Sequence, residues 1–132
     1  RVITAEARSY LGVTSVGHRR YDVVVSDCFG GAEPVRELAT VEALRLVRGS
    51  LNPGGIYVAN IVSANRGSDV TFLRDCAATA LEVFAHAWVV PCGDAEFGGE
   101  ENYLLIASDG DYAFAEAVPF DTDFLGTVLH DK

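Results

Sequence analysis

The stretch YDVVVSDCFGG, residues 21–31, decides the fold of this sequence. Its three consecutive valines leave no polar position on either face of an extended chain. A strand that is apolar on both faces is typical of a sheet covered by helices on both sides. Gly30, Gly31 and Pro34 then interrupt the extended pattern. We therefore predict a strand at residues 21–26, with the carboxylate of Asp27 placed at its end.

Helical and extended patterns alternate through the rest of the chain. Apolar residues recur at helical spacing in two later segments, and the turn NPGG separates the first of these segments from an apolar strand. Helices are expected at residues 7–13, 40–51 and 70–84, and further strands at residues 56–62, 87–91 and 103–107. This alternation predicts one α/β domain over residues 1–132, with helices on both faces of a mainly parallel sheet that a final antiparallel pair closes.

Length and composition fit one small globular domain. The chain has 132 residues, of which 49% are hydrophobic and 22% are charged. No apolar run approaches the ~20 residues that cross a bilayer, and no basic and apolar leader opens the chain, so we expect a cytoplasmic protein without a membrane partner. Cys28, Cys76 and Cys92 are odd in number and form no C-x-x-C pair, so we expect neither a disulfide framework nor a metal site.

Negative charge is concentrated in the second half of the chain. Residues 1–74 carry nine arginines and seven acids, whereas residues 75–132 carry one lysine and twelve acids, for a net charge of −9. Such a surface repels phosphate backbones, which argues against a nucleic acid partner. It would attract small cations such as polyamines, although most acidic surfaces serve solubility alone.

Four segments stand in an order that resembles a known family. They are TAEARSYL, YDVVVSD, LNPGGIYVANIVS and NYLLIAS, and the match spans most of residues 1–108. A strand that ends in Asp and an L-x-P-G-G turn occur in many methyltransferases, but the ordered set resembles the second half of class I S-adenosylmethionine-dependent transferases and, among these, the spermidine synthase (polyamine aminopropyltransferase) family. The resemblance implies the C-terminal half of a three-layer, Rossmann-like methyltransferase fold, with the glycine-rich N-terminal half missing from this sequence.

The resemblance also implies which residues hold the cofactor and carry the reaction. In the family a strand-end acid and a small residue receive the adenine amino group, and Glu6 and Ala7 stand at those positions, with Glu in place of Asp. Asp27 matches the acid that ends the next strand, so we expect it to act as the general base, with Cys28 beside it at the cofactor. A base is needed because alkylamines are protonated at pH 7 and must lose that proton to attack a carbon.

On the substrate side, the resemblance points to Asn60 and Ser63, which match an amide and a serine after the family's P-G-G turn. The family's second loop acid is absent, since Gly30 stands in its place. Glu33 therefore becomes the candidate partner for the far cation of a diamine. Four later acids could serve instead, namely Asp94, Glu96, Glu100 and Glu101.

Each of these candidates also has a simpler structural interpretation. Asp27 can cap its own loop, and Glu6 can stabilise the start of the helix that follows it. Asn60 and Ser63 can satisfy backbone groups at the end of a strand. The sequence alone leaves both interpretations open.

The expected function is transfer of an aminopropyl group from decarboxylated S-adenosylmethionine to a small-molecule amine such as a polyamine. Two alternatives stay open: a methyltransferase that uses S-adenosylmethionine on an unknown substrate, and a non-catalytic domain that keeps the fold for assembly. Without the strand that precedes it in the complete fold, residues 21–26 become an apolar sheet edge, which favours association. We expect this edge to pair with residues 1–5 or with the same strand of a second copy in a homodimer.

Overall fold

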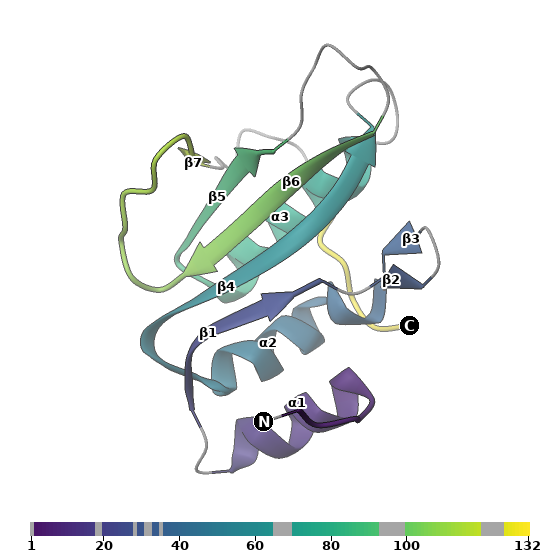
Figure 1. The fold of residues 1–132 in the computed structure, drawn as a ribbon, viewed down its shortest axis with the longest axis vertical. Helices are drawn as coiled ribbons and strands as arrows, with labels where there is room; N and C mark the ends of the chain where they lie inside the picture. Colours follow the sequence, from purple (N-terminus) through teal and green to yellow (C-terminus); the bar gives the residue numbers. More distant parts are fainter. Residues whose placement is uncertain are drawn as a thin grey trace.

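The computed structural model describes residues 2–17, 20–27, 29–30, 33–34, 36–64, 70–92, 100–119 and 126–132. Over these residues the chain forms one larger sheet with helices packed on it, and one short sheet of two strands (Figure 1). The elements are, in chain order, α1 (Ala7–Val16), β1 (Tyr21–Ser26), β2 (Phe29–Gly30), β3 (Glu33–Pro34), the 3-10 turn η1 (Arg36–Leu38), α2 (Val41–Gly49), β4 (Leu51–Ala64), α3 (Val70–Val83), β5 (His86–Pro91), β6 (Glu100–Ser108) and β7 (Val118–Pro119).

The larger sheet has the strand order β1-β4-β6-β5-β7. The pair β1 and β4 is parallel, whereas the pairs β4–β6, β6–β5 and β5–β7 are antiparallel. The prediction of a mainly parallel sheet is therefore wrong, although the predicted antiparallel closing pair is present. The reason is that β6 inserts between β4 and β5, two strands that run in the same direction, and pairs with both in the opposite sense.

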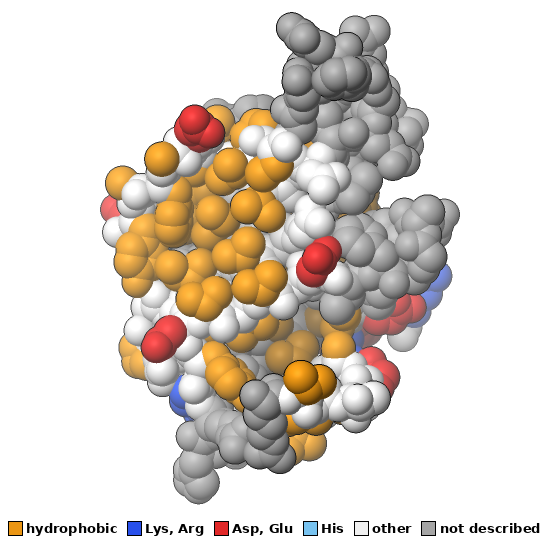
Figure 2. Space-filling view, in the orientation of Figure 1, with side chains coloured by type: hydrophobic (Ala, Val, Ile, Leu, Met, Phe, Trp, Pro, Cys, Tyr) orange, Lys and Arg blue, Asp and Glu red, His pale blue; other side chains and the backbone are white. Residues whose placement is uncertain are grey.

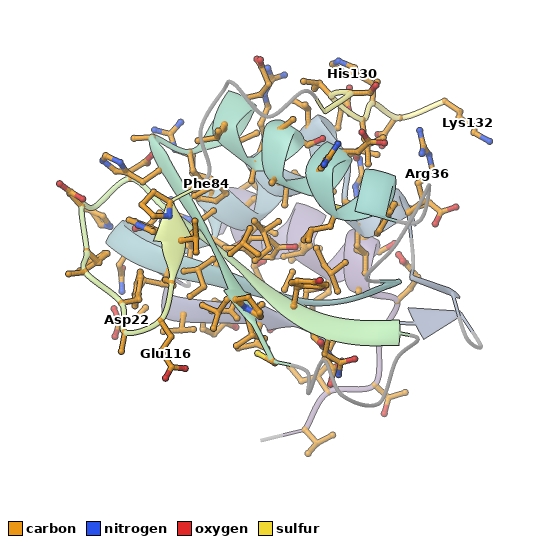
Figure 3. The ribbon with its side chains drawn as sticks, turned by 90° about the horizontal axis from the view of Figure 1, so that it is seen from above. Asp22, Arg36, Phe84, Glu116, His130 and Lys132 are labelled. Atoms are coloured by element: carbon orange, nitrogen blue, oxygen red, sulfur yellow. The ribbon has the colours of Figure 1, made fainter. Side chains whose placement is uncertain are left out.

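Helices α2 and α3 pack against one face of this sheet, and α1 packs beside α2 (Figures 1 and 3). The core lies between them and the strands, and it includes Leu44, Val47, Tyr57, Ala59, Leu73, Ala77 and Leu105. Among the described residues no helix covers the opposite face of the sheet. The predicted three-layer arrangement is therefore wrong for this part of the chain, which has two layers.

Strand β4 begins earlier than predicted, because the NPGG segment lies inside it. The pairing of β1 with β4 jumps from Tyr21↔Leu51 to Val23↔Ile56, so that the extra residues of β4 bulge between these pairs. Gly54 has a φ of 75°, a conformation that favours glycine, and its carbonyl oxygen accepts a hydrogen bond from the Tyr112 hydroxyl at 2.7 Å. The segment is thus a bend within a strand.

The face turned away from the helices carries an apolar row across all five strands of the larger sheet. The strand registers align Val25, Val58, Ile106, Trp88 and Pro119 along this row. Figure 2 shows apolar side chains gathered on this face. Phe114 packs edge-on against the buried Trp88, with the ring centroids 5.0 Å apart. The face is therefore covered in part over β5, whereas it is exposed over β1.

Strand β1 lies at an edge of the sheet, since it pairs with β4 alone in the described part of the chain. Val23 and Val25 on this strand are 50% and 66% exposed. The predicted apolar edge is therefore confirmed. Residues 2–5 form no strand, so they do not fill the place beside β1.

No helix formed by the described residues combines the length and the apolar character that a membrane span requires.

Candidate functional site

The carboxylate of Asp27 and the side-chain amide of Asn60 meet where β1 ends. The parallel register pairs Ser26 with Ala59, so the next residue of each strand lies beside the other. Asn60 Nδ2 donates a hydrogen bond to Asp27 Oδ1 at 3.0 Å. The amide orients the carboxylate and leaves it able to accept further hydrogen bonds, because an ionised carboxylate has about four acceptor positions. This hydrogen bond thus joins Asp27 to Asn60 of the neighbouring strand β4, which is also a predicted site residue.

Glu6 acts as the N-terminal cap of α1. Its Oε1 accepts from the backbone N–H of Arg8 at 3.0 Å, and its Oε2 accepts from that of Ser9 at 2.7 Å. These hydrogen bonds, that of Ser9 first, hold the pKa of Glu6 below its ordinary value. Glu6 therefore has the structural role that the sequence allowed, since it stabilises the start of α1. It does not exclude a ligand, since each carboxylate oxygen retains a second acceptor position.

A cavity of about 300 Å³ lies between α1, η1 and the edge strand β1. Ala7 from α1, Ser26 from β1 and Leu38 from η1 contribute to its wall. Ala7 follows Glu6 in the chain and Ser26 precedes Asp27, so the cavity lies next to both predicted site residues. Tyr57 of β4 also contributes, and most of the wall is apolar. Such a surface suits a flat, weakly polar group held between polar ends.

Two pairs of hydroxyl groups lie in the wall of this cavity. The hydroxyls of Tyr10 and Tyr21 are 3.0 Å apart, and Thr14 Oγ1 lies 2.8 Å from Ser50 Oγ. Tyr10 stands in the segment TAEARSYL, but nothing in the sequence indicates that it lines a cavity. Leu38 belongs to none of the four segments. The packing of α1 with α2 and η1, beside the edge strand β1, places both residues in the cavity wall.

Other predicted site residues lie partly or wholly outside the described residues. Cys28 is outside them, as are Asp94 and Glu96. Glu33 is placed by its backbone in β3, and Ser63 by its backbone in β4, where it pairs with Glu101 in β6. The side chains of Glu33, Ser63, Glu100 and Glu101 are outside the described part of the structure.

Among the described side chains, no three from His, Cys, Asp and Glu converge as metal ligands would. Cys76 and Cys92 are free thiols. Cys76 is buried in the core, and this burial raises its pKa to about 12, so its thiol stays protonated near neutral pH. Its place in the core identifies it as a packing residue.

Comparisons with known proteins agree with this architecture. No protein-family model matches the sequence. The chain is 30% identical over 82 residues to a probable polyamine aminopropyl transferase of Bifidobacterium longum, and the match covers 61% of this chain and 18% of that protein. The whole chain superimposes on a probable spermidine synthase of Corynebacterium glutamicum with a TM-score of 0.77 and 23% identity, covering 54% of that structure.

Two further solved structures share the fold. Human methyltransferase-like protein 13, solved with SAH, has a TM-score of 0.64 and 21% identity over 82% of this chain and 48% of its own. Spermidine synthase of Thermotoga maritima has a TM-score of 0.60 and 19% identity over 83% of this chain and 35% of its own. The chain thus shares its fold with spermidine synthases and with a methyltransferase-like protein. It spans about half of the length of the Corynebacterium glutamicum structure.

Proposed function

We propose that this chain forms part of an aminopropyltransferase that moves an aminopropyl group from decarboxylated S-adenosylmethionine to an amine of a polyamine. The observation that carries the proposal is the contact between Asp27 and Asn60 beside the cavity. Ligands of open α/β sheets bind in the crevice beyond the carboxyl ends of the strands, which is where Asp27 lies. The similarity to proteins named as aminopropyl transferase and spermidine synthase supports the same reaction.

In the proposed reaction, Asp27 is the general base. The protonated amine gives its proton to the carboxylate, and its nitrogen then forms a bond to the carbon beside the sulfonium. The carbon–sulfur bond breaks, its electron pair returns to sulfur, and methylthioadenosine leaves. Asn60 acts through Asp27, because its amide fixes the oxygen that it contacts and so directs the other toward the amine.

The cavity is proposed to take the adenosyl group. Its apolar wall suits an adenine ring, and Glu6 would accept a hydrogen bond from the adenine amino group next to Ala7. Cys28, which follows Asp27, is assigned to the same cofactor. Ser63 and Glu33 are assigned to the amine, with Glu33 as the carboxylate for the far cation of a diamine.

A methyltransferase is the second candidate function. It is favoured by the shared fold with human methyltransferase-like protein 13, which was solved with SAH. The donor would then be S-adenosylmethionine, and the same cavity would take its adenosyl group. A non-catalytic assembly domain is the third candidate, and an experiment has to distinguish it from the two enzymes.

Calorimetry on the chain separates these functions. Methylthioadenosine is a product of aminopropyl transfer, whereas S-adenosylhomocysteine is the product of methyl transfer. Binding of methylthioadenosine alone supports the aminopropyltransferase, and binding of S-adenosylhomocysteine alone supports the methyltransferase. Binding of neither at millimolar concentration contradicts both and leaves the assembly domain. Asp27→Asn is not expected to abolish methylthioadenosine binding, because the base acts on the amine.

We also propose that the edge of β1 pairs with β1 of a second copy. An antiparallel pair centred on Val24 sets Val23 of one copy opposite Val25 of the other, and Asp22 opposite Ser26. The exposed valines then contact each other, and no two acids of the strands stand opposite one another. A two-fold axis through Val24 makes the interface self-complementary, as closed dimers require.

A further inference from the structure

The last described segment, residues 126–132, is held by hydrogen bonds to α2 and α3. Leu129 is 3% exposed and belongs to the core. Its carbonyl oxygen accepts from Val41 N–H at 2.8 Å, and its own N–H donates to Thr79 Oγ1 at 2.9 Å. Thr127 N–H donates to Asp75 Oδ1 at 2.8 Å. Helices α2 and α3 therefore both hold this segment. Asp131 lies only two residues after the buried Leu129.

Asp131 and Arg8 form a two-pronged ion pair. Arg8 Nη2 donates to Asp131 Oδ2 at 2.6 Å, and Arg8 Nη1 donates to Asp131 Oδ1 at 3.2 Å. Thr40, the cap of α2, donates its hydroxyl to the same Oδ1 at 2.8 Å. The Asp131 carboxylate is thus held from α1 and α2 at once. Arg8 is about a quarter exposed in this arrangement, so the pair is partly shielded from solvent.

The same guanidinium reaches a third element. Arg8 Nη1 donates to the backbone carbonyl of Glu37 in η1 at 2.9 Å. The residue before Arg8 is Ala7 and the residue after Glu37 is Leu38, and both line the cavity between α1 and β1. Arg8 therefore bridges the two elements that supply these wall residues. Its backbone N–H also donates to Glu6, which caps α1.

We infer that Asp131 is a positioning residue, which holds Arg8 and through it fixes the spacing of α1 and η1, and so the shape of the cavity. Asp131 itself lies outside the cavity wall. A guanidinium that is held by a carboxylate through two hydrogen bonds has a fixed orientation, so its other N–H groups are fixed too. Here one of these N–H groups donates to the Glu37 carbonyl. Without Asp131, Arg8 would be free to turn to solvent. The identity of the ligand rests on the proposed function, but the shape of the cavity in the free protein does not.

The test compares Asp131→Asn with Asp109→Asn. Asp109 is the control, because its carboxylate also pairs with an arginine, Arg48, at 2.8 Å and is as exposed as that of Asp131, and neither Asp109 nor Arg48 lines the cavity. We expect Asp131→Asn to weaken methylthioadenosine binding about two- to fivefold, as for the loss of a partly exposed ion pair. Asp109→Asn should leave binding unchanged, and because Arg48 is more exposed than Arg8, it should lower Tm by no more than Asp131→Asn does. Equal binding by both variants would overturn the inference.

A second readout needs no ligand. The methyl resonances of Ala7 and Leu38 in NMR spectra of the free protein should shift in Asp131→Asn, while those of Val118 on the distant strand β7 should not. Arg8→Lys should shift the same methyl groups, because one ammonium cannot reproduce the fork to Asp131 and the contact with Glu37 together. If the unaltered chain binds no methylthioadenosine, the proposed function fails, and this readout still decides the inference. Unmoved Ala7 and Leu38 methyl groups would overturn it.

Discussion

Asn60 Nδ2 lies 3.0 Å from Asp27 Oδ1 and joins the end of β1 to the middle of β4. A second contact of the same kind occurs at the other end of β1, where Asn52 Nδ2 donates to Asp22 Oδ1 at 2.9 Å. Both acids are exposed, Asp22 within β1 and Asp27 directly after it, and each has an asparagine partner from β4. The two differ in their surroundings, because Asp27 follows the wall residue Ser26 at the carboxyl end of the strand. Asp22 therefore serves as a matched control for Asp27.

Asp27→Asn should weaken binding of a diamine. Calorimetry with putrescine, in the presence of saturating methylthioadenosine, should show a loss of roughly tenfold or more, as for a lost hydrogen bond between charged groups. Asp22→Asn should bind putrescine like the unaltered chain. Equal losses in the two variants would mean that general acidity of the surface, rather than Asp27, attracts the amine.

Val25→Lys should prevent pairing of two copies through β1. Its ammonium would stand opposite Val23 of the second copy, in an apolar pair on the sheet surface. Sedimentation velocity should then show a dimer for the unaltered chain and a monomer for the variant. Val118→Lys on the edge strand β7 is the control, since Val118 is 56% exposed, and it should stay dimeric. A monomer for the unaltered chain contradicts the proposed dimer.

Gly54→Ala should destabilise the fold, whereas Gly12→Ala should stabilise it. At Gly54 the φ of 75° strains any side chain, and an added Cβ would lie 3.3 Å from the Tyr112 hydroxyl oxygen. At Gly12, in the middle of α1, an added Cβ meets no atom within 4 Å. The free energy of unfolding in urea should fall by about 1 kcal/mol in the first variant and rise by about 0.5–1 kcal/mol in the second. A Gly54→Ala variant at least as stable as the unaltered chain would contradict the assigned bend in β4.

Acid should loosen the contacts of residues 126–132. The hydrogen bond from Arg8, followed by that from Thr40, lowers the pKa of Asp131, and the backbone N–H of Asp131 lowers the pKa of Glu42. Because these pKa values are lowered in the folded state, the stability they contribute is full above the ordinary values near 4 and is lost as pH falls through the folded values.

Asp131 pairs with Arg8, and Glu42 contacts the ring of His130. The contribution of these two carboxylates to Tm should therefore change little between pH 7 and 5, and Tm should fall below about pH 4. Asp131→Asn should reduce the size of that fall. An unchanged fall in the variant would show that Asp131 does not contribute to it.

Local patterns predict the elements of this fold well. The valines at residues 23–25 place β1 at its observed bounds, and the apolar stripe of α3 predicts a helix within one residue of its end. Thr40, predicted as the first helical residue, is instead the cap of α2. These features depend on neighbours in sequence, which is why they can be predicted without a structure.

Contacts between distant segments could not be predicted in this way. The insertion of β6 between β4 and β5 depends on pairings such as Ile56 with Ser108, and no local pattern specifies them. The cavity needs α1 to pack near η1 and β1, and the contact of Arg8 with Asp131 joins residues 123 positions apart. The pairing of Asp27 with Asn60 follows from the strand register, once β1 and β4 are known to be parallel neighbours.

NMR titration of the chain with methylthioadenosine tests most directly whether the cavity beside Asp27 and Asn60 is the adenosyl site. If it is, the Ala7 and Leu38 methyl groups and the Asn60 side-chain amide should shift saturably, with Val118 unmoved. Unshifted signals at these three positions at millimolar ligand, or shifts that gather on the distant strand β7 instead, would show that the cavity is not the adenosyl site.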